Sequence, residues 1–279
     1  MLGVIGGTGL YKMEALQDIR KRSIDTPWGK PSAEVTLGTY EGNEIAFLPR
    51  HGSHHELLPS EINYRANIWA LKYLGVKRVI SVSAVGSLDD SIRPGELAIP
   101  SQYVDWTRGK RDATFFGEGL VAHVSTAEPT CPDLTQLLIN AGRELGILLH
   151  SEKTYVCVEG PRLGTRAESF FLKNNGFHLV GMTYVPEVFL CREAQVSYCT
   201  LAVVTDYDCW MEDSSQHVSV DKVMALYMKS IDLVQKLLKN VFAIKFDEDS
   251  SKCRKSLEGA IVTQSIPLSK TEMLRVLKL

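Results

Sequence analysis

The sequence has no long apolar run and no block of like charges. None of its apolar stretches approaches the roughly 18–20 residues that cross a bilayer. Met1 to Thr8 contains neither a basic residue nor an apolar segment of the kind that opens a secretory signal. Lysine and arginine are scattered and the formal net charge is -2, which argues against nucleic acid or an anionic membrane as a partner. These absences predict a soluble, cytoplasmic protein.

Cysteine spacing typical of metal or redox sites is absent too. The six cysteines form no CxxC pair, and several stand in apolar runs, where a reduced thiol packs as a small hydrophobic group. Three histidines lie close together in His51-Gly-Ser-His-His55, but their spacing matches no standard zinc pattern. A metal site is therefore the least favoured interpretation of this segment, behind anion binding and an ordinary surface loop.

The chain alternates short β-prone runs with amphipathic segments of helical period. Strands are predicted at the start of 2–10, where a short strand breaks into glycines, and over 33–37, 44–49, 76–84, 153–158, 177–182 and 198–205. Helices are predicted over 60–74, 132–145, 167–175, 186–196 and 219–238. Such alternation predicts an α/β fold, here a single domain with a mixed central β-sheet flanked by helices. We expect a main α/β domain over 1–246 and a C-terminal hinge and helical tail, 247–279, that packs on it. Serine caps are expected at the starts of three helices, at Ser60, at Ser219 and, in the tail, at Ser269.

Four predicted strand ends carry small, hydroxyl or cationic groups. In α/β sheets ligands bind beyond the carboxyl ends of the strands, and glycines there let backbone amides approach a phosphate closely. An arginine offers a planar fork of donors, to which an adjacent histidine adds another. The groups in question are Thr8, Arg50 with His51, Ser83 with Ala84, and Thr183. Each could equally belong to an ordinary turn, but together they favour an anion site.

Two carboxylates follow the most apolar of the predicted strands. This strand ends in Thr205-Asp-Tyr-Asp-Cys-Trp210, which brings Asp206 and Asp208 to the same edge of the sheet. A solvated turn is the competing interpretation, because aspartate is common in turns. If the acids meet the anion-binding groups, the site holds phosphate on one side and a proton donor on the other. That combination suits phosphorolysis, in which phosphate displaces a base from a sugar.

Seven motifs, in this order along residues 2–240, resemble the trimeric purine nucleoside phosphorylase family. They are Gly6-Gly-Thr-Gly-Leu10, Arg50-His-Gly52, Asn63-Tyr-Arg-Ala-Asn67, Ala84-Val-Gly-Ser-Leu88, Glu159-Gly-Pro-Arg162 with Arg166-Ala-Glu-Ser169, Gly181-Met-Thr183 with Pro186-Glu187, and Thr205-Asp-Tyr-Asp-Cys-Trp210. The resemblance implies a homotrimeric pentosyltransferase that acts on a small nucleoside. Inorganic phosphate would be its co-substrate, and it would need no metal and no organic cofactor.

The resemblance also implies residue roles. Thr8, Arg50, His51, Ser83, Ala84 and Thr183 would bind phosphate. Met182 would lie against the ribose, Asp206 would share or donate the proton at purine N7, and Asp208 would help hold a 6-amino group. Protonating N7 helps the base to leave while positive charge builds on the ribose, and the bound phosphate attacks C1′ from the opposite face.

The expected substrate is methylthioadenosine, cleaved to adenine and 5-methylthioribose 1-phosphate. Val220, Val223 and Met224 form an apolar patch suited to a methylthio group, although helix-core packing explains them equally well. The resemblance places His123 near that group, across a subunit interface. Leu163 and Gly164 stand where the family more often has an aromatic residue and serine. This departure is expected to loosen the sugar pocket and to permit some cleavage of adenosine.

Three other functions compete with this one. A 6-oxopurine nucleoside or methylthioinosine phosphorylase is the nearest, but relatives acting on 6-oxopurines resemble one another in having asparagine where this chain has an aspartate. An NAD(P)-dependent reductase would use the glycines of 6–9 with Tyr73 and Lys77, yet Gly75 interrupts that helical face and the glycines lack the expected following helix and acid. A catalytically silent nucleoside-binding protein is the third.

Overall fold

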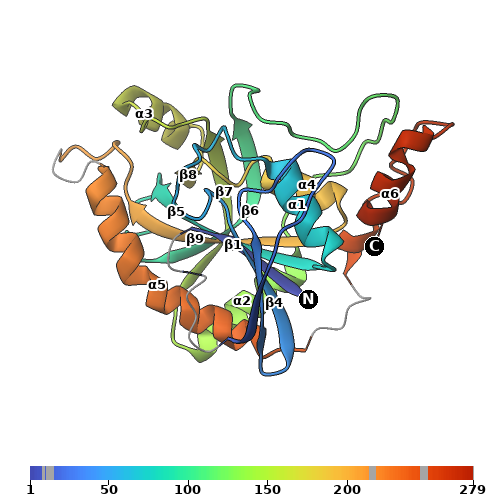
Figure 1. Cartoon of the computed structure of the whole chain (residues 1–279). Helices are drawn as coiled ribbons and strands as arrows, with labels where there is room; N and C mark the ends of the chain where they lie inside the picture. The colour runs from blue at the N-terminus through green and yellow to red at the C-terminus, as the bar shows by residue number, and fades with distance from the viewer. Residues whose placement is uncertain (8–9, 11–15, 214–217, 246–250, 279) are drawn as a thin grey trace.

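The computed structural model describes residues 1–7, 10, 16–213, 218–245 and 251–278 (Figure 1). Thr8 therefore lies outside the described residues. At the centre of the described chain is a mixed sheet in the order β2-β3-β4-β1-β5-β8-β7-β6-β9. Its strands are β1 (Leu2–Gly6), β2 (Gln17–Arg22), β3 (Val35–Tyr40), β4 (Asn43–Pro49), β5 (Arg78–Ser87), β6 (Leu97–Trp106), β7 (Leu149–Val158), β8 (Leu179–Gly181) and β9 (Ser197–Asp206). The α/β fold expected from the sequence is confirmed.

The last strand closes part of this sheet into a ring. β9 pairs antiparallel with β6 and parallel with β5, so β5, β8, β7, β6 and β9 form a closed circuit, and β1 to β4 extend it as a side wall. The β5–β9 register places Gly86 opposite Asp206. The carboxyl ends of these two parallel strands therefore deliver their residues to the same place.

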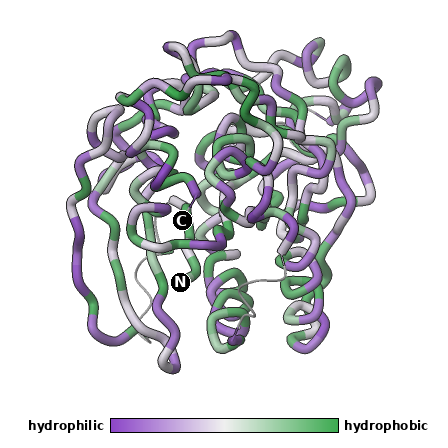
Figure 2. The backbone as a smooth tube through the Cα atoms, turned by 90° about the vertical axis from the view of Figure 1, so that its right-hand side faces the viewer, coloured by the Kyte–Doolittle hydropathy of each residue, from purple (hydrophilic) through white to green (hydrophobic). Residues whose placement is uncertain are grey.

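Helices cover both faces of the sheet, and each face has its own core. On one face α1 (Tyr64–Tyr73), α4 (Glu187–Glu193) and α6 (Thr271–Leu277) pack together (Figure 1). On the other, α2 (Pro132–Glu144) packs against α5 (Val220–Phe242). α3 (Arg166–Asn174) lies beside β7 and β8 at the cavity end. Figure 2 shows hydrophobic positions recurring between hydrophilic ones along the chain, as expected where one side of each element is buried.

Several boundaries differ from those expected. α1 begins at Tyr64 rather than at Ser60, because the side chain of Asn63 accepts a hydrogen bond from the Ala66 amide at 3.1 Å and caps the helix there. Tyr73, at the end of this helix, is 51% exposed. The edge strand β2, exposed along its whole length, has no apolar alternation and was not expected.

The described part of the tail packs on the main body. Leu257 and the apolar side chains of α6 belong to the same buried cluster as α1 and α4, and Cys253 belongs to the cluster of α2 and α5. The cap expected at Ser269 is wrong, because Ser269 lies in a 3-10 turn (Leu268–Lys270) and α6 starts after Lys270. Among the described residues, no helix is both long and apolar enough to cross a bilayer.

Candidate active site

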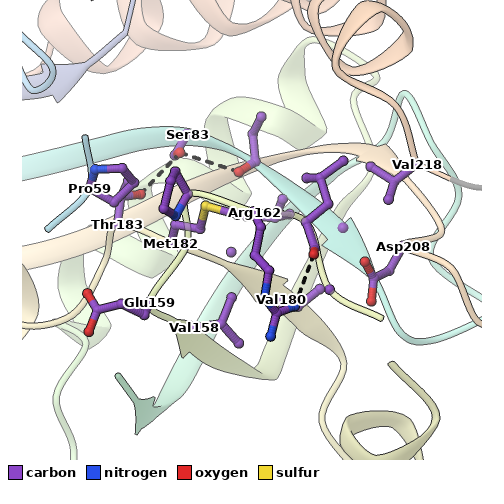
Figure 3. Close-up of a pocket in the computed structure, with 18 of the residues that line it drawn as sticks. Pro59, Ser83, Val158, Glu159, Arg162, Val180, Met182, Thr183, Asp208 and Val218 are labelled. Atoms are coloured by element: carbon purple, nitrogen blue, oxygen red, sulfur yellow. Dashed lines mark hydrogen bonds between the residues drawn. The ribbon is translucent and has the colours of Figure 1, made fainter. Parts of the chain in front are cut away.

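A cavity of about 1040 Å³ opens at the carboxyl ends of β5, β7 and β9. Residues from these strand ends, from the turn after β8 and from the start of α5 surround it (Figure 3). It gathers most of the residues singled out from the sequence, namely His51, Ser83, Ala84, Gly164, Met182, Thr183, Asp206, Asp208, Val220, Val223 and Met224. The strand-end argument thus correctly brought Ser83, Ala84, Thr183, Asp206 and Asp208 to one cavity, but not Arg50, and the roles of these residues stay predictions.

Two predicted residues do not lie in this cavity. Arg50 instead borders a smaller adjoining space of about 80 Å³, which it shares with Ser83 and Ala84. His123 is exposed at the surface and is not part of the cavity lining of its own subunit, and its backbone amide donates to the Ala260 carbonyl at 2.9 Å.

The expected role of the Arg50 guanidinium as a fork for phosphate disagrees with its geometry. The side chain is buried and its Nε and Nη2 donate to both carboxylate oxygens of Glu187, at 2.9 and 3.2 Å. Nη1 donates to the Val82 carbonyl at 3.0 Å, and Nη2 also contacts Ser81. A carboxylate therefore already occupies this fork, and its negative charge offsets part of the positive charge that Arg50 would present to a ligand.

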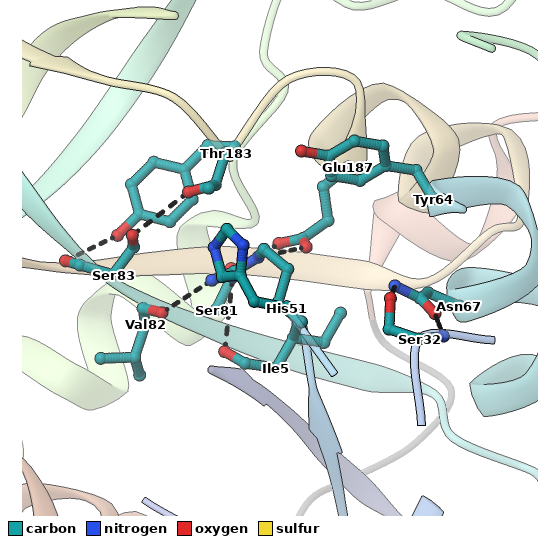
Figure 4. Close-up of polar contacts among 12 residues, drawn as sticks. Ile5, Ser32, His51, Tyr64, Asn67, Ser81, Val82, Ser83, Thr183 and Glu187 are labelled. Carbon is teal, nitrogen blue, oxygen red and sulfur yellow. Dashed lines mark hydrogen bonds and ion pairs between the residues drawn. The ribbon is translucent and has the colours of Figure 1, made fainter. Parts of the chain in front are cut away.

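Two hydroxyls converge at the anion end of the cavity. The Thr183 Oγ1 donates to the Ser83 Oγ at 3.2 Å, and the Ser83 Oγ contacts the Ala84 carbonyl at 3.3 Å (Figure 4). The Tyr184 hydroxyl donates to the Ser83 carbonyl at 3.2 Å and holds β5 against the turn after β8. Hydroxyl hydrogens rotate freely, so Ser83 and Thr183 can turn their donors toward an oxyanion.

His51 stands beside these hydroxyls as a neutral ring. Its Nδ1 lies 2.9 Å from the Leu57 carbonyl, and its ring stacks on His55 with 4.5 Å between centroids. Burial, followed by the charge of Arg50, lowers the pKa of His51 to about 4. A neutral ring whose Nδ1 hydrogen points at Leu57 has no second N–H to give, so the expectation that this histidine adds a donor for the anion disagrees with this geometry.

Asp206 is a buried carboxyl with a raised pKa. Its two oxygens accept from the Thr205 hydroxyl and from the Asp208 amide, both at 2.7 Å. Burial, opposed by those two hydrogen bonds and aided by the charge of Asp208, raises the pKa of Asp206 to about 6. A carboxyl near this value can hold or release a proton close to neutral pH.

Asp208 lies at the same end, in a left-handed backbone conformation with φ of 55°. Burial raises its pKa as well. Gly86 makes room for both acids, because a Cβ at that position would stand 2.9 Å from an Asp206 oxygen and 3.4 Å from the Asp208 Cβ. The interpretation of this segment as a solvated turn is wrong, since both residues are more than nine-tenths buried.

Gly164 faces Asp208, because a Cβ added at this glycine would lie 3.9 Å from both Asp208 oxygens. It was expected to shape the sugar pocket, and the structure instead places it at the end of the cavity that carries the acids. Met182 does lie on the cavity wall (Figure 3), where Gly160 approaches it so closely that a Cβ there would be 2.5 Å from the Met182 Sδ.

The apolar patch at the start of α5 lines the cavity rather than the core. Val220 is 64% and Met224 is 44% exposed in the single chain, while the core positions of this helix begin at Tyr227. The core-packing interpretation of these residues is therefore wrong. Val218, which sequence reasoning missed, joins the patch.

Arg111 is the main residue near the site that sequence reasoning missed. It extends from the loop after β6 and pairs with Glu159, Nε to Oε1, at 3.1 Å. Its Nη1 donates to the carbonyls of Met182 and Val185, each at 2.7 Å. A loop as long as 105–119 is often functional, but its length does not indicate which of its residues acts. Within the described residues, no three metal-binding side chains cluster.

Comparisons with known proteins agree with this geometry. Residues 1–243 match the family model described as the phosphorylase superfamily. The S-methyl-5'-thioadenosine phosphorylase of Geobacter sulfurreducens is 46% identical over 98% of this chain and 96% of its own length, and that of Thermococcus kodakarensis is 49% identical over 85% and 90%.

Solved structures extend the likeness to three dimensions. A methylthioadenosine phosphorylase from an antarctic soil metagenomic library superposes with a TM-score of 0.93, at 44% identity, over 99% of this chain and 98% of its own. A mutant adenosine/methylthioadenosine phosphorylase from Schistosoma mansoni, in complex with adenine, has a TM-score of 0.83 at 38% identity, over 87% and 90%. The chain is a pentosyltransferase that belongs to the S-methyl-5'-thioadenosine phosphorylase family within the phosphorylase superfamily.

Proposed function

We propose that this protein cleaves methylthioadenosine with inorganic phosphate, giving adenine and 5-methylthioribose 1-phosphate. The observation that carries the proposal is one cavity with hydroxyl donors at one end and a carboxyl of pKa about 6 at another. The names of the relatives agree with this substrate.

In this mechanism phosphate lies against Ser83, Thr183 and the Ala84 backbone, with His51 beside it. Thr8 completes the proposed phosphate site, although it lies outside the described residues. As the glycosidic bond lengthens, positive charge grows on the ribose, and the phosphate both stabilises that charge and attacks C1′. We assign Arg50 a supporting role, because its guanidinium is held by Glu187.

At the base end, Asp206 shares its proton with N7 of the leaving adenine. Burial keeps part of the Asp206 population protonated near neutral pH, and neutralising the departing base is typically worth about 10²–10⁴ in rate. Asp208, 8% exposed, accepts from the 6-amino group. Met182 lies against the ribose, and the patch of Val218, Val220, Val223 and Met224 receives the methylthio group.

We also propose a homotrimer in which His123 reaches the 5′ end of a substrate bound to a neighbouring subunit. Its place at the surface, away from the cavity of its own chain, is compatible with that role. Size-exclusion chromatography with light scattering tests the assembly, and a monomer that retains full activity would contradict it.

Adenosine is the second substrate that we propose. The relative from Schistosoma mansoni is named for adenosine as well as methylthioadenosine, and the cavity has a volume of about 1040 Å³. We expect measurable adenine release from millimolar adenosine with phosphate, at a lower kcat/KM than from methylthioadenosine. No detectable turnover of adenosine would refute this part of the proposal.

The deciding experiment is product analysis with methylthioadenosine and with methylthioinosine, each with and without phosphate. Phosphate-dependent adenine release supports the proposal. Preferential release of hypoxanthine would support phosphorolysis but show that the preferred base is a 6-oxopurine. Release of base without phosphate would indicate a hydrolase.

A further inference from the structure

The orientation of His51 is fixed by a group that can only accept a hydrogen bond. The Leu57 carbonyl oxygen lies 2.9 Å from Nδ1, so Nδ1 must carry the hydrogen. The other ring nitrogen, Nε2, is then the polar atom of the His51 side chain that remains for a ligand. In a neutral ring Nε2 accepts a hydrogen bond, and in a charged ring it donates one.

The surroundings of His51 favour the neutral ring. The ring is largely buried, its neighbour in sequence is the charged Arg50, and His55 stacks on it. Glu187 is the acid that would favour a charged ring, but both of its oxygens already accept from Arg50. Glu56, which also borders the cavity, accepts from the His54 amide at 2.7 Å.

The neutral ring stands at the anion end of the site. His51 borders both the main cavity and the small adjoining space, and it shares both of them with Ser83 and Ala84. An oxyanion held there by hydroxyl donors therefore also meets one acceptor. Phosphate at neutral pH keeps at least one P–OH group, which can donate to that acceptor, whereas sulfate keeps none.

We propose that Nε2 of His51 accepts a hydrogen bond from the protonated oxygen of the bound oxyanion, and that this contact makes the site select phosphate or arsenate over sulfate. The inference rests on the proposed function for its choice of ligand. An unprotonated oxygen opposite Nε2 leaves two acceptors facing each other. By the usual cost of such an unsatisfied buried group, sulfate binds roughly 10- to 100-fold more weakly than it would without His51.

The test measures dissociation constants of inorganic phosphate and of sulfate by calorimetry, in the wild type and in His51→Gln. The glutamine amide can donate as well as accept, so we expect the ratio of the sulfate constant to the phosphate constant to fall about tenfold or more. In the matched control His54→Gln, whose exposed side chain borders neither space, the ratio is expected to stay unchanged. An unchanged ratio in a folded His51→Gln protein overturns the proposal.

A second measurement needs no variant. In wild-type protein labelled with ¹⁵N-histidine, a neutral His51 ring protonated at Nδ1 with phosphate bound supports the proposal, and a doubly protonated ring overturns it. Both readouts are equilibrium measurements on inorganic anions. A failure to cleave any nucleoside would thus refute the proposed function while still leaving this selectivity measurable.

Discussion

The guanidinium of Arg50 donates two hydrogen bonds to the carboxylate of Glu187, and both side chains are only 1% exposed. Glu187 opens α4, shortly after Thr183, and Arg50 also holds the Val82 carbonyl, next to Ser83. The pair therefore joins the two segments whose hydroxyls face the anion end of the cavity. Arg50 thus positions those hydroxyls through its hydrogen bonds, while its guanidinium donates to Glu187.

Replacing Glu187 by glutamine is expected to destabilise the protein by about 3–5 kcal/mol, because a buried guanidinium loses its counter-charge. Urea unfolding measures the loss. The control is Glu44→Gln, which removes the exposed partner of Arg20 and is expected to cost less than about 1 kcal/mol. Equal, small losses of unfolding free energy in the two variants would show that the buried pair stabilises the protein no more than the exposed pair does.

Replacing Asp206 by asparagine is expected to lower kcat for adenine release by roughly 10²–10⁴, because the amide cannot supply a proton to N7. Residual activity is expected to shift toward 6-oxopurine nucleosides, whose O6 accepts from an amide. Initial rates with methylthioadenosine and methylthioinosine check both points. Wild-type rates with methylthioadenosine would exclude Asp206 as the proton donor.

The raised pKa of Asp206 predicts a pH dependence of stability. Folding favours the neutral carboxyl, so its contribution to stability is complete below the ordinary pKa of 3.8 and is lost as pH rises through about 6. Asp206→Asn removes this loss. Relative to the wild type, the free energy of unfolding of the variant is expected to rise between about pH 4 and about pH 6 and then to stay constant. The total rise is on the order of 3 kcal/mol. Free energies of unfolding across this range measure it, and a flat difference would contradict the buried, raised carboxyl.

Gly160 and Gly146 form a matched pair for testing the ribose wall. Both have positive φ, of 70° and 68°, so alanine is similarly strained at either position. Only at Gly160 would the new Cβ meet Met182, since nothing lies within 4 Å at Gly146. We expect Gly160→Ala to raise KM for the nucleoside and Gly146→Ala to leave it unchanged, as measured by steady-state kinetics. Equal KM values in the two variants would show that Met182 does not contact the substrate.

Arg111→Lys is expected to lower both stability and activity. Lysine cannot reproduce the fork that joins Glu159 to the carbonyls of Met182 and Val185, and weakening a buried pair of this kind costs about 3 kcal/mol. The neighbouring Asp112→Asn, whose side chain is exposed and pairs with Arg65, serves as the control. Chemical denaturation and kcat/KM are the readouts. If Arg111→Lys loses stability but keeps wild-type kcat/KM, Arg111 has no influence on the site.

The sequence predicted the parts of the site that follow from local pattern. Asp206 meets the end of β5 because β5 and β9 are parallel and present their carboxyl ends at one edge. The hydroxyls of Ser83 and Thr183 meet for another reason, because β8 runs antiparallel to β5 and the turn after it lies beside that strand. Pairings between distant residues were beyond such reasoning. Arg50 and Glu187 stand 137 positions apart, and nothing in either segment indicates that one neutralises the other.

The start of α1 was missed for a related reason. Ser60 and Asn63 are both good caps, and the choice between them depends on tertiary contacts. The Asn63 side chain also donates to the Trp28 carbonyl at 2.7 Å, a contact with a turn far away in the sequence. Local preference could therefore place the helix but not its first residue.

Because β9 closes the ring of strands, part of the sheet stays open until late in the synthesis of the chain. β5 has its neighbour β1 as soon as the chain has been made as far as Ser87, but β9, its other long parallel partner, ends only at Asp206. Until then both β5 and β6 expose an edge that β9 will later cover, and open edges of this kind invite pairing with other chains. A product truncated before β9 would thus lack Asp206 and Asp208 and also be prone to aggregate, so incomplete chains would be removed from solution rather than persist as inactive nucleoside binders.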